Sequence, residues 1–333
     1  MKVALVILNY NGASLLSKYL PSVLAHSQGA EVWVIDNAST DDSARVLEEE
    51  FPQVNVLFNS ENNGYAGGYN WGLPQIEADV YGLLNSDLQV TSGWLEPLAH
   101  MMKEDPEISI VQPKIKDLKK PEYFEYAGAA GGFLDRLGYP FCRGRVFQSI
   151  ETDLGQYNDT IPVFWATGAC FLVRSSVFHE LGGFDADYFA HQEEIDFCWR
   201  AQNQGHQVWY NGQSEVFHLG GSTLSNMNPR KTFLNFRNSL FTLLKNTAKP
   251  EVFALLFARM VLDGIAAVVF LLQRKPAHSW AVFRAHLAFY KSCRSMWAKR
   301  GKSQKSVKFY RTTSIVWLHY VQQIREYRGL VKD

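Results

Sequence analysis

Apolar and polar positions alternate in blocks along the first third of the chain. Short apolar runs rich in β-branched residues predict buried strands at residues 3–8, 32–35, 54–58 and 80–84. Segments with helical periodicity lie between these runs, and Ser14 stands where it would cap the first helix. Alternation of strand and helix is typical of a doubly wound, largely parallel sheet, so we predict an α/β fold.

The pattern loses this regularity in the middle of the chain. Residues 114–160 mix glycine, aromatic and charged residues, which predicts insertions or short antiparallel strands. Apolar periodicity then returns and predicts a strand pair at 161–174, helices at 175–181 and 193–204, and short strands at 208–210 and 216–219. We therefore expect one large domain over residues 1–245 and a helical, basic extension over residues 246–333.

The composition indicates the size of the core and the cellular compartment of the protein. The chain has 333 residues, 47% hydrophobic and 20% charged, which is enough for a large core and an appendage. The four cysteines lack the spacing of a zinc site, and we expect Cys170 and Cys198 to be buried thiols in a reducing compartment. No small-residue cleavage site follows the apolar start, so we predict a first strand rather than a signal peptide, and a cytoplasmic protein.

Polar residues stand at the carboxyl ends of several predicted strands. Asn9 follows the first strand, Asp36 the second, and Asn85-Ser86-Asp87 the fourth. Ligands of open α/β sheets bind at this edge, where an aspartate is a candidate ligand for a hard cation that carries phosphate oxygens. Taken alone, Asn85-Ser86-Asp87 is more often an ordinary polar turn, because Asn, Ser and Asp are common turn formers.

A glycine- and asparagine-rich segment lies just before the fourth strand. It includes Asn63, Gly64 and Gly67, and we expect a helix to begin at about Ala66. A helix amino terminus entered through small residues suits an anion or a closely packed sugar. A flexible loop explains the same composition equally well.

Three acids crowd the start of the helix predicted at 193–204. Glu193, Glu194 and Asp196 could simply stabilise the positive end of the helix dipole. Crowded like charges also raise a carboxyl pKa, which suits a general base that takes a proton from a hydroxyl. Farther on, Arg237 suits a diphosphate, and His218 ends a predicted strand, although a lone histidine is more often structural.

Taken in order, these motifs resemble those of the family-2 glycosyltransferases, inverting enzymes with the Rossmann-like GT-A fold, over about residues 3–245. The matching segments are Val-Ile-Leu-Asn9-Tyr-Asn-Gly12, Val-Ile-Asp36-Asn37, Asn63-Gly-Tyr-Ala-Gly-Gly68, Asn85-Ser-Asp87 and Glu193-Glu-Ile-Asp-Phe-Cys-Trp-Arg200. The resemblance implies that Glu194 is the catalytic base and that Asp87 and His218 bind a divalent cation, Mg²⁺ or Mn²⁺. It implies substrate contacts from Asn9, Asp36, Asn63, Gly64, Gly67, Asn85, Trp165, Glu193, Asp196 and Arg237.

Two positions depart from the family pattern. Asn85 replaces the first acid of the usual Asp-x-Asp motif, which leaves Asp87 as the only anionic ligand there. Glu194 stands where aspartate is common, and its extra methylene changes the reach of the carboxylate but not its chemistry. Together with the strand break at 165–169, this combination is similar to that of rhamnosyltransferases, which implies rhamnose or another hexose as the sugar.

The resemblance implies transfer from a dTDP- or UDP-linked sugar to a hydroxyl of a glycan or lipid-linked acceptor, in cell-wall or polysaccharide biosynthesis. Two alternatives stay open. A sugar nucleotidyltransferase also needs a metal-held diphosphate, although the first strand here lacks the basic glycine-rich loop expected of such an enzyme. A non-catalytic nucleotide-sugar-binding protein is favoured by Asn85 and opposed by Glu194.

The extension is strongly basic. Residues 273–333 carry fourteen Lys and Arg against two acids, so the net charge of the remaining chain is −12. The apolar run at 252–272 has transmembrane length, but Arg259 and Asp263 interrupt it with a spacing that lets them pair on one helical face. An interfacial helix, a spanning helix and a helix buried against the domain all stay open.

Basic and aromatic residues alternate beyond the apolar run. This composition suits an anionic lipid surface, so we expect peripheral association with the inner face of the cell membrane. It would also suit RNA, but no recognition module accompanies it, and we expect no nucleic-acid partner.

Overall fold

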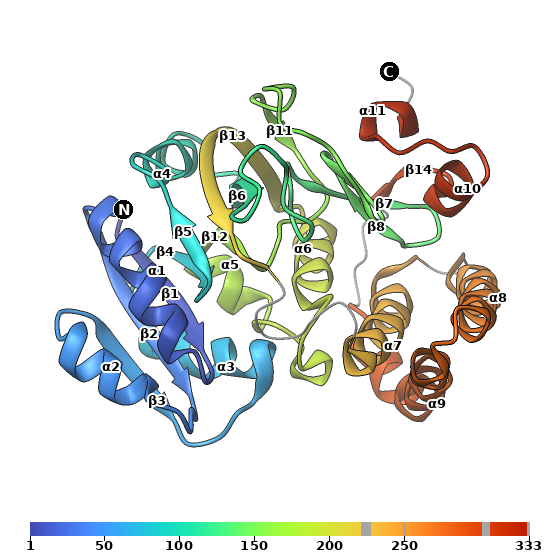
Figure 1. The fold of residues 1–333 in the computed structure, drawn as a ribbon, viewed down its shortest axis with the longest axis horizontal. Coiled ribbons are helices and arrows are strands. Elements are labelled where there is room, and N and C mark those ends of the chain that lie inside the picture. Colours follow the sequence, from blue (N-terminus) through green and yellow to red (C-terminus); the bar gives the residue numbers. More distant parts are fainter. Residues whose placement is uncertain (221–227, 249–250, 302–306, 332–333) are drawn as a thin grey trace.

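The computed structural model describes residues 1–333 apart from 221–227, 249–250, 302–306 and 332–333. Within the described residues a nine-stranded sheet has the order β11-β13-β6-β12-β4-β1-β2-β3, and β5 pairs with β13 (Figure 1). Its strands are β1 Val3–Asn9, β2 Ala30–Asn37, β3 Asn55–Asn59, β4 Val80–Asn85, β5 Leu88–Val90, β6 Ile108–Asp117, β11 Thr160–Pro162, β12 Cys170–Arg174 and β13 Gln207–His218. The predicted α/β fold is confirmed.

The order of the first strands collects their polar ends. β3, β2, β1 and β4 are parallel neighbours, so their carboxyl ends meet at one edge of the sheet. The register pairs Asn9 with Asp36 and Leu8 with Asn85. β12 runs antiparallel to β4 and β6, which makes the sheet mixed rather than wholly parallel.

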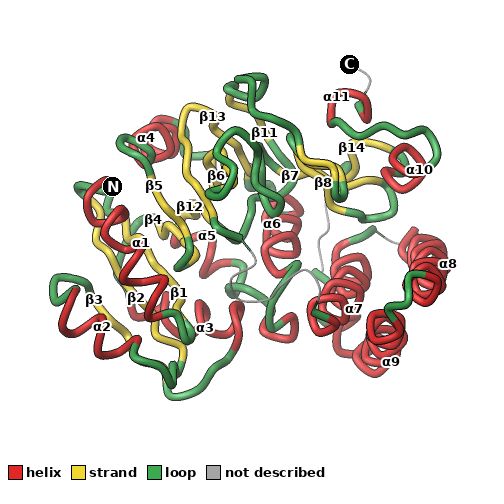
Figure 2. Tube along the Cα trace, viewed as in Figure 1, coloured by secondary structure: helices red, strands yellow, loops and turns green. Residues whose placement is uncertain are grey.

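Helices cover both faces of this sheet (Figure 2). They are α1 Ala13–His26, α2 Ser43–Glu50, α3 Gly64–Gly72, α4 Leu95–Glu104, α5 Ser175–Glu180 and α6 Glu193–Asn203. Successive side chains of a strand point to opposite faces, and in β1 Leu5 joins the core that α1, α2 and α4 cover, whereas Val6 joins the core that α3, α5 and α6 cover. Cys170 and Cys198 are buried free thiols, as predicted.

Two local predictions are wrong. Ser14 does not cap α1, because Gly12 precedes the helix and Asp41 accepts a hydrogen bond from the Ala13 amide at 3.0 Å. The strands predicted at 208–210 and 216–219 are one strand, β13, whose pairing with β6 is irregular between Asn211 and Glu215. A bulge interrupts the apolar alternation without ending the strand.

A second sheet forms from the irregular middle of the chain. Its order is β10-β9-β8-β7-β14, with β7 Gly132–Asp135, β8 Pro140–Cys142, β9 Arg145–Val146, β10 Ser149–Ile150 and β14 Tyr310–Thr312. The pairs from β7 to β10 are antiparallel, which confirms short antiparallel strands between residues 114 and 160. β14 belongs to the extension, so the extension is not exclusively helical.

The extension packs against the sheets at one end of the molecule (Figure 1). It continues from α7 Pro229–Asn246 through α8 Glu251–Leu272, α9 Pro276–Ala298, α10 Ile315–Tyr320 and α11 Tyr327–Leu330. Within the described residues, α8 is the helix long and apolar enough to cross a membrane, with a mean hydropathy of 2.3. Arg259 and Asp263 pair at 3.1 Å and are buried, so the charged face of α8 points into the protein.

Candidate functional site

The carboxyl ends of β1 and β2 form a prearranged polar pair. Asn9 Nδ2 donates a hydrogen bond to Asp36 Oδ2 at 2.9 Å, and Asp36 Oδ1 accepts one from the Ser39 amide at 2.9 Å. Both side chains are buried, and Asn9 Oδ1 has no hydrogen-bond partner within the described residues. A Cβ on Gly12 would lie 2.3 Å from that oxygen, so only glycine leaves the space beside it open.

Three polar side chains meet where β4 and β13 end. His218 Nε2 lies 3.0 Å from Asp87 Oδ1 and 3.2 Å from Asn85 Nδ2. On the other side of the ring, His218 Nδ1 lies 3.4 Å from Glu125 Oε1. Burial alone would lower the pKa of His218, but the carboxylates of Glu125 and Asp87 raise it to about 10.

This group of Asn85, Asp87 and His218, the candidate metal corner, fits a divalent cation in part. One oxygen of Asp87 and Nε2 of His218 are close enough to contact the same ion, and Glu125 orients the ring from its far side, as carboxylates commonly do for metal-binding histidines. Within the described residues no group of three His, Cys, Asp or Glu side chains surrounds a common point. Phosphate oxygens of a substrate or water would have to complete the coordination.

Sequence analysis missed Glu125. It lies in the irregular segment between β6 and β7, where no periodicity or motif marks it. Its carboxylate also accepts a hydrogen bond from the Ala127 amide, and only the fold brings it to His218.

The carboxylates at the start of α6 lie in two different environments. Asp196 is completely buried and bonded to Arg200, Lys245 and Asn246. Burial alone would raise its pKa, but the cations of Lys245 and Arg200 and the hydrogen bond from Asn246 keep it low. Glu194 is different, because its Oε2 is buried without a hydrogen-bond partner within the described residues and burial raises its pKa to about 7. Burial and the charge of Glu194 also raise the pKa of Glu193 well above its usual value.

A strained turn presents these two glutamates. Phe189, His191 and Gln192 all have positive φ, between 63° and 73°, immediately before α6 begins. Asn238 Nδ2 donates to the carbonyls of Tyr188, Ala190 and His191. Non-glycine residues keep such conformations only where several contacts hold them. Asn238 supplies such contacts here, a role that its place in the sequence does not indicate.

The glycine-rich segment supports the same turn. The predicted helix is present as α3 but begins at Gly64, where φ is +70°. A Cβ on Gly64 would lie 2.5 Å from the carbonyl oxygen of Phe189, and the Tyr65 amide donates to that oxygen at 2.8 Å. Asn63 precedes the helix and is exposed, and Gly67 is half-buried above it. The segment is therefore ordered structure rather than a flexible loop.

The metal corner and the glutamates are joined by a short chain of contacts. The Asn85 amide donates to the Ala169 carbonyl at 3.0 Å, and Tyr65 Oη donates to the Gly168 carbonyl at 2.8 Å. A Cβ on Gly168 would lie 3.9 Å from Cβ of Glu194. The strand break before β12 therefore lies between the two halves of the site.

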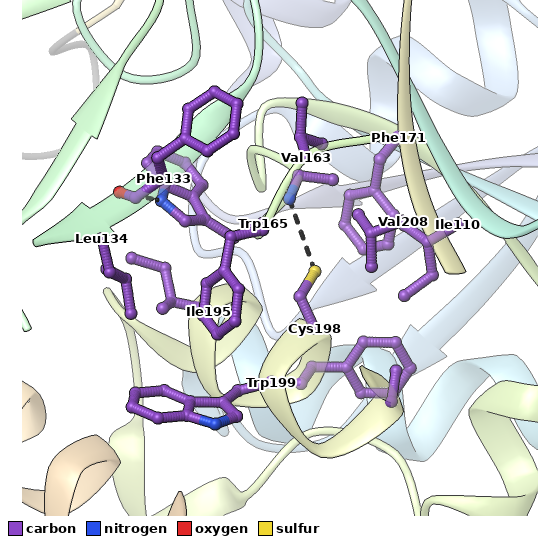
Figure 3. Close-up of a cluster of buried hydrophobic side chains, with 14 of the residues drawn as sticks. Ile110, Phe133, Leu134, Val163, Trp165, Phe171, Ile195, Cys198, Trp199 and Val208 are labelled. Carbon is purple, nitrogen blue, oxygen red and sulfur yellow. Dashed lines mark hydrogen bonds between the residues drawn. The ribbon is translucent and has the colours of Figure 1, made fainter. Parts of the chain in front are cut away.

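Three predicted substrate contacts are engaged within the protein. Trp165 is 2% exposed, and its indole Nε1 donates to the Phe133 carbonyl in the core beneath the site (Figure 3). Asp196 is enclosed by its ion pairs, as described above. Arg237 donates to the carbonyls of Asp187 and Tyr188, so it holds the turn that precedes the glutamates. The structure thus gives these side chains contacts within the protein, and their contact with a substrate stays a prediction.

Comparison with known proteins finds relatives in sequence and in fold. Over 232 residues, which is 64% of this chain and 74% of the relative, the chain is 28% identical to N-acetylglucosaminyl-diphospho-decaprenol L-rhamnosyltransferase of Mycobacterium tuberculosis. The fold is similar to a mannosyltransferase of Pyrobaculum calidifontis in complex with GDP-Man and Mn²⁺ (TM-score 0.52, 15% identity, 90% of this chain and 83% of that one).

The fold is also similar to S. aureus TarS in complex with UDP-GlcNAc, with a TM-score of 0.54, 13% identity, and coverage of 90% of this chain and 91% of that one. These structures share the GT-A architecture, with its curled central sheet and flanking helices. The family model of glycosyl transferase family 2 matches residues 4–182, more than half of the chain. Because this model covers more than half of the chain, the chain belongs to glycosyl transferase family 2.

Proposed function

We propose that this glycosyltransferase inverts the anomeric centre and uses Glu194 as its general base. The observation that carries the proposal is the buried Glu194 oxygen without a hydrogen-bond partner within the described residues, on a carboxyl whose pKa is about 7. A carboxyl with this pKa is deprotonated often enough near neutral pH to accept a proton, and basic enough to drive its removal.

The residues at the carboxyl ends of the parallel strands would bind the donor. Asn9 and Asp36 present an amide and a carboxylate to the nucleoside of a dTDP- or UDP-linked sugar. Asp87 and His218 would hold Mg²⁺ or Mn²⁺, which when bound neutralises charge on the leaving diphosphate. Asn63, Gly64 and Gly67, at the amino end of α3, would line the surface beside the same substrate, while the Gly64, Tyr65 and Ala66 amides donate to Asn62 and Phe189.

In the transfer step one bond forms and one bond breaks. Glu194 takes the proton of an acceptor hydroxyl as that oxygen forms a bond to the anomeric carbon from the face opposite the diphosphate. The bond between the anomeric carbon and the diphosphate oxygen breaks, and the nucleoside diphosphate leaves with its electron pair. Attack from the opposite face inverts the anomeric configuration.

The sugar and acceptor are proposed from similarity. The mycobacterial relative carries a rhamnosyl donor specificity and a diphosphate-linked lipid acceptor in its name. We therefore propose rhamnose or another hexose as the transferred sugar, and a glycan or lipid-linked sugar as the acceptor, in cell-wall or polysaccharide biosynthesis. A donor panel of nucleotide sugars with Mn²⁺, in which released nucleoside diphosphate is measured, tests this assignment.

The same panel separates the alternatives. Release of nucleoside diphosphate from one donor supports the transferase. Formation of a nucleotide sugar from a nucleoside triphosphate and a sugar phosphate would instead identify a nucleotidyltransferase. Binding of a donor without any release would identify a nucleotide-sugar-binding protein.

We also propose that the extension holds the enzyme on the cytoplasmic face of an anionic membrane. The outer side of α8 is apolar, and its exposed members recur every three to four residues: Phe253, Phe257, Val261, Ile265, Val268 and Leu272. Phe257 is 72% exposed, while Arg259 and Asp263 are buried on the opposite side. This is the reverse of the pattern of a helix in water, where charges face the solvent.

Helix α9 continues the same surface. Trp280, Phe283, Leu287 and Tyr290 are exposed along one stripe, and the exposed Arg284, Lys291 and Arg294 lie beside that stripe. Aromatic and aliphatic side chains enter the lipid interface while basic side chains meet anionic head groups. A helix that lies in the membrane plane fits the inward-facing ion pair of α8 better than a spanning helix.

A further inference from the structure

Arg145 is an unusual cation within the second sheet. It lies on β9 and is 7% exposed, and its Nε has no hydrogen-bond partner within the described residues. Its guanidinium contacts the Cys142 sulfur, 3.5 Å from Nη2, and the ring of Tyr126, whose centroid is 4.8 Å from the guanidinium carbon. No carboxylate of the described residues lies within ion-pair distance of it.

The other buried arginines of this protein have strong acceptors. Arg143, two residues earlier, makes two hydrogen bonds to Asp159, and Arg259 pairs with Asp263. Buried charges are ordinarily paired, because removing an ion from water costs several kcal/mol that only a partner offsets. Burial alone would lower the pKa of Arg145, but Cys142, Tyr126 and the charge of Glu125 raise it. Within the described residues Arg145 therefore lacks the directly bonded carboxylate that Arg143 and Arg259 have.

The position of Arg145 connects it to the catalytic site. Tyr126, on which it stacks, follows Glu125, and Glu125 contacts His218 at 3.4 Å. Burial raises the pKa of the neighbouring Cys142 thiol, and the charges of Glu125 and Glu194 raise it further. The guanidinium is thus within electrostatic reach of Glu125, the carboxylate beside His218, and its neighbour Cys142 is within reach of Glu194.

The hairpin that carries Arg145 also contacts the extension. Phe147 lies two residues after Arg145 and packs against Tyr320 of α10, with ring centroids 5.2 Å apart. Tyr320, Trp317 and Val321 are exposed by 55% to 59%. An apolar surface therefore leads from α10 to the hairpin that carries the cation.

We propose that Arg145 binds a phosphate group of an amphiphilic acceptor, whose apolar chain lies along Phe147 and Tyr320. The inference rests on the proposed transferase function only in naming the bound substrate as the acceptor. The donor diphosphate has its own candidate contacts at Asp87, His218 and α3. An acceptor that joins an apolar chain to a sugar through phosphate would match this surface. Its chain would meet the aromatic side chains, its phosphate Arg145, and its sugar the proposed base.

The test measures binding of farnesyl diphosphate, a phosphate group on an apolar chain without a sugar, by calorimetry in saturating UDP and Mn²⁺. We expect Arg145→Met to weaken farnesyl diphosphate binding at least about tenfold, the usual worth of a charge-assisted hydrogen bond. Farnesol binding and UDP affinity should stay at wild-type values. Arg136→Gln, which removes an exposed arginine of the same sheet, is the matched control and should bind like the wild type.

Thermal unfolding keeps the result interpretable. Because Arg145 has no ion-pair partner within the described residues, Arg145→Met should unfold at the wild-type temperature or above it, whereas Arg143→Met should unfold lower. Wild-type affinity of Arg145→Met for farnesyl diphosphate would overturn the proposal, as would a loss of UDP affinity instead. A fall in unfolding temperature as large as that of Arg143→Met would also overturn it, since it would show a structural role. Absence of donor turnover with intact farnesyl diphosphate binding would contradict only the transferase function.

Discussion

At the scale of single residues, the pKa of Glu194 makes a direct prediction about pH. Burial raises this pKa to about 7, so the carboxyl is protonated below that pH and cannot take a proton. We expect kcat/KM to fall about tenfold for each unit of pH below 7 and to level off above it, because only the deprotonated fraction is active. A pH profile measured at saturating metal checks this, and a rate independent of pH from 5 to 7 would contradict it.

The metal corner predicts the behaviour of a second substitution. Asp87→Asn removes the single carboxylate that lies against His218 Nε2, so we expect activation by Mn²⁺ to require at least about tenfold more metal. Metal titrations of turnover measure this shift. Wild-type enzyme in excess chelator should lose activity as well. Full activity in chelator would remove the metal from the mechanism.

Residue chemistry was predictable where short motifs carry it. Asn9, Asp36, Asp87 and Glu194 all lie where strand ends and helix starts had placed them, because parallel strands deliver their carboxyl ends to one edge. Glu125 was not predictable, since it comes from a segment without periodicity. The burial of Trp165 was not predictable, because an aromatic side chain beside a strand break is compatible both with a surface position and with the core.

At the scale of elements, two side chains of α7 hold the turn before α6, Arg237 and Asn238, and Asn238 makes the larger number of bonds to it. Asn238→Ala would leave the carbonyls of Tyr188, Ala190 and His191 without this donor. We expect the free energy of unfolding to fall by about 1–3 kcal/mol, the cost of unsatisfied buried polar groups. Because the turn positions Glu194, kcat should fall while the KM for donor stays near the wild-type value.

Asn238→Asp provides the matched comparison. It keeps the shape of the side chain but replaces the donor nitrogen with an acceptor, so it should resemble Asn238→Ala. Denaturant unfolding and steady-state kinetics measure the two effects. A wild-type kcat in both variants would show that the turn keeps its conformation without the side chain.

Element boundaries show where sequence patterns reach their limit. The alternation of strand and helix predicted β1 to β4 within a few residues, because each buried strand is a compact apolar run. β13 was divided in two because a bulge changes which side chains face the core. The pairing of β14 with β7 joins residues about 180 positions apart, a tertiary contact that no local pattern encodes.

At the scale of the whole molecule, the surface of α8 and α9 predicts binding to lipid. We expect the enzyme to co-sediment with vesicles that contain anionic phospholipid and to dissociate partly in high salt, which screens the basic side chains. Phe257→Asp should weaken binding at every salt concentration. Phe58→Asp is the matched control, because Phe58 is 50% exposed on β3, at the opposite end of the molecule (Figure 1). Equal binding by both variants would contradict the assignment of this surface.

The distribution of charge was visible in the sequence, but its meaning depended on the fold. The spacing of Arg259 and Asp263 predicted an ion pair, and the structure confirms it. Only the packing of α8 shows that the pair faces inward and the apolar side chains outward, since helical periodicity does not say which face meets the protein.

The central claim is that Glu194 removes the proton from the acceptor, and the transfer rate of Glu194→Gln tests it most directly. Glutamine keeps the size of the side chain but cannot accept the proton. We predict a rate of transfer about 10²–10⁴-fold below wild type with unchanged donor affinity, since general-base catalysis is worth that much. Transfer by Glu194→Gln at the wild-type rate would contradict the account.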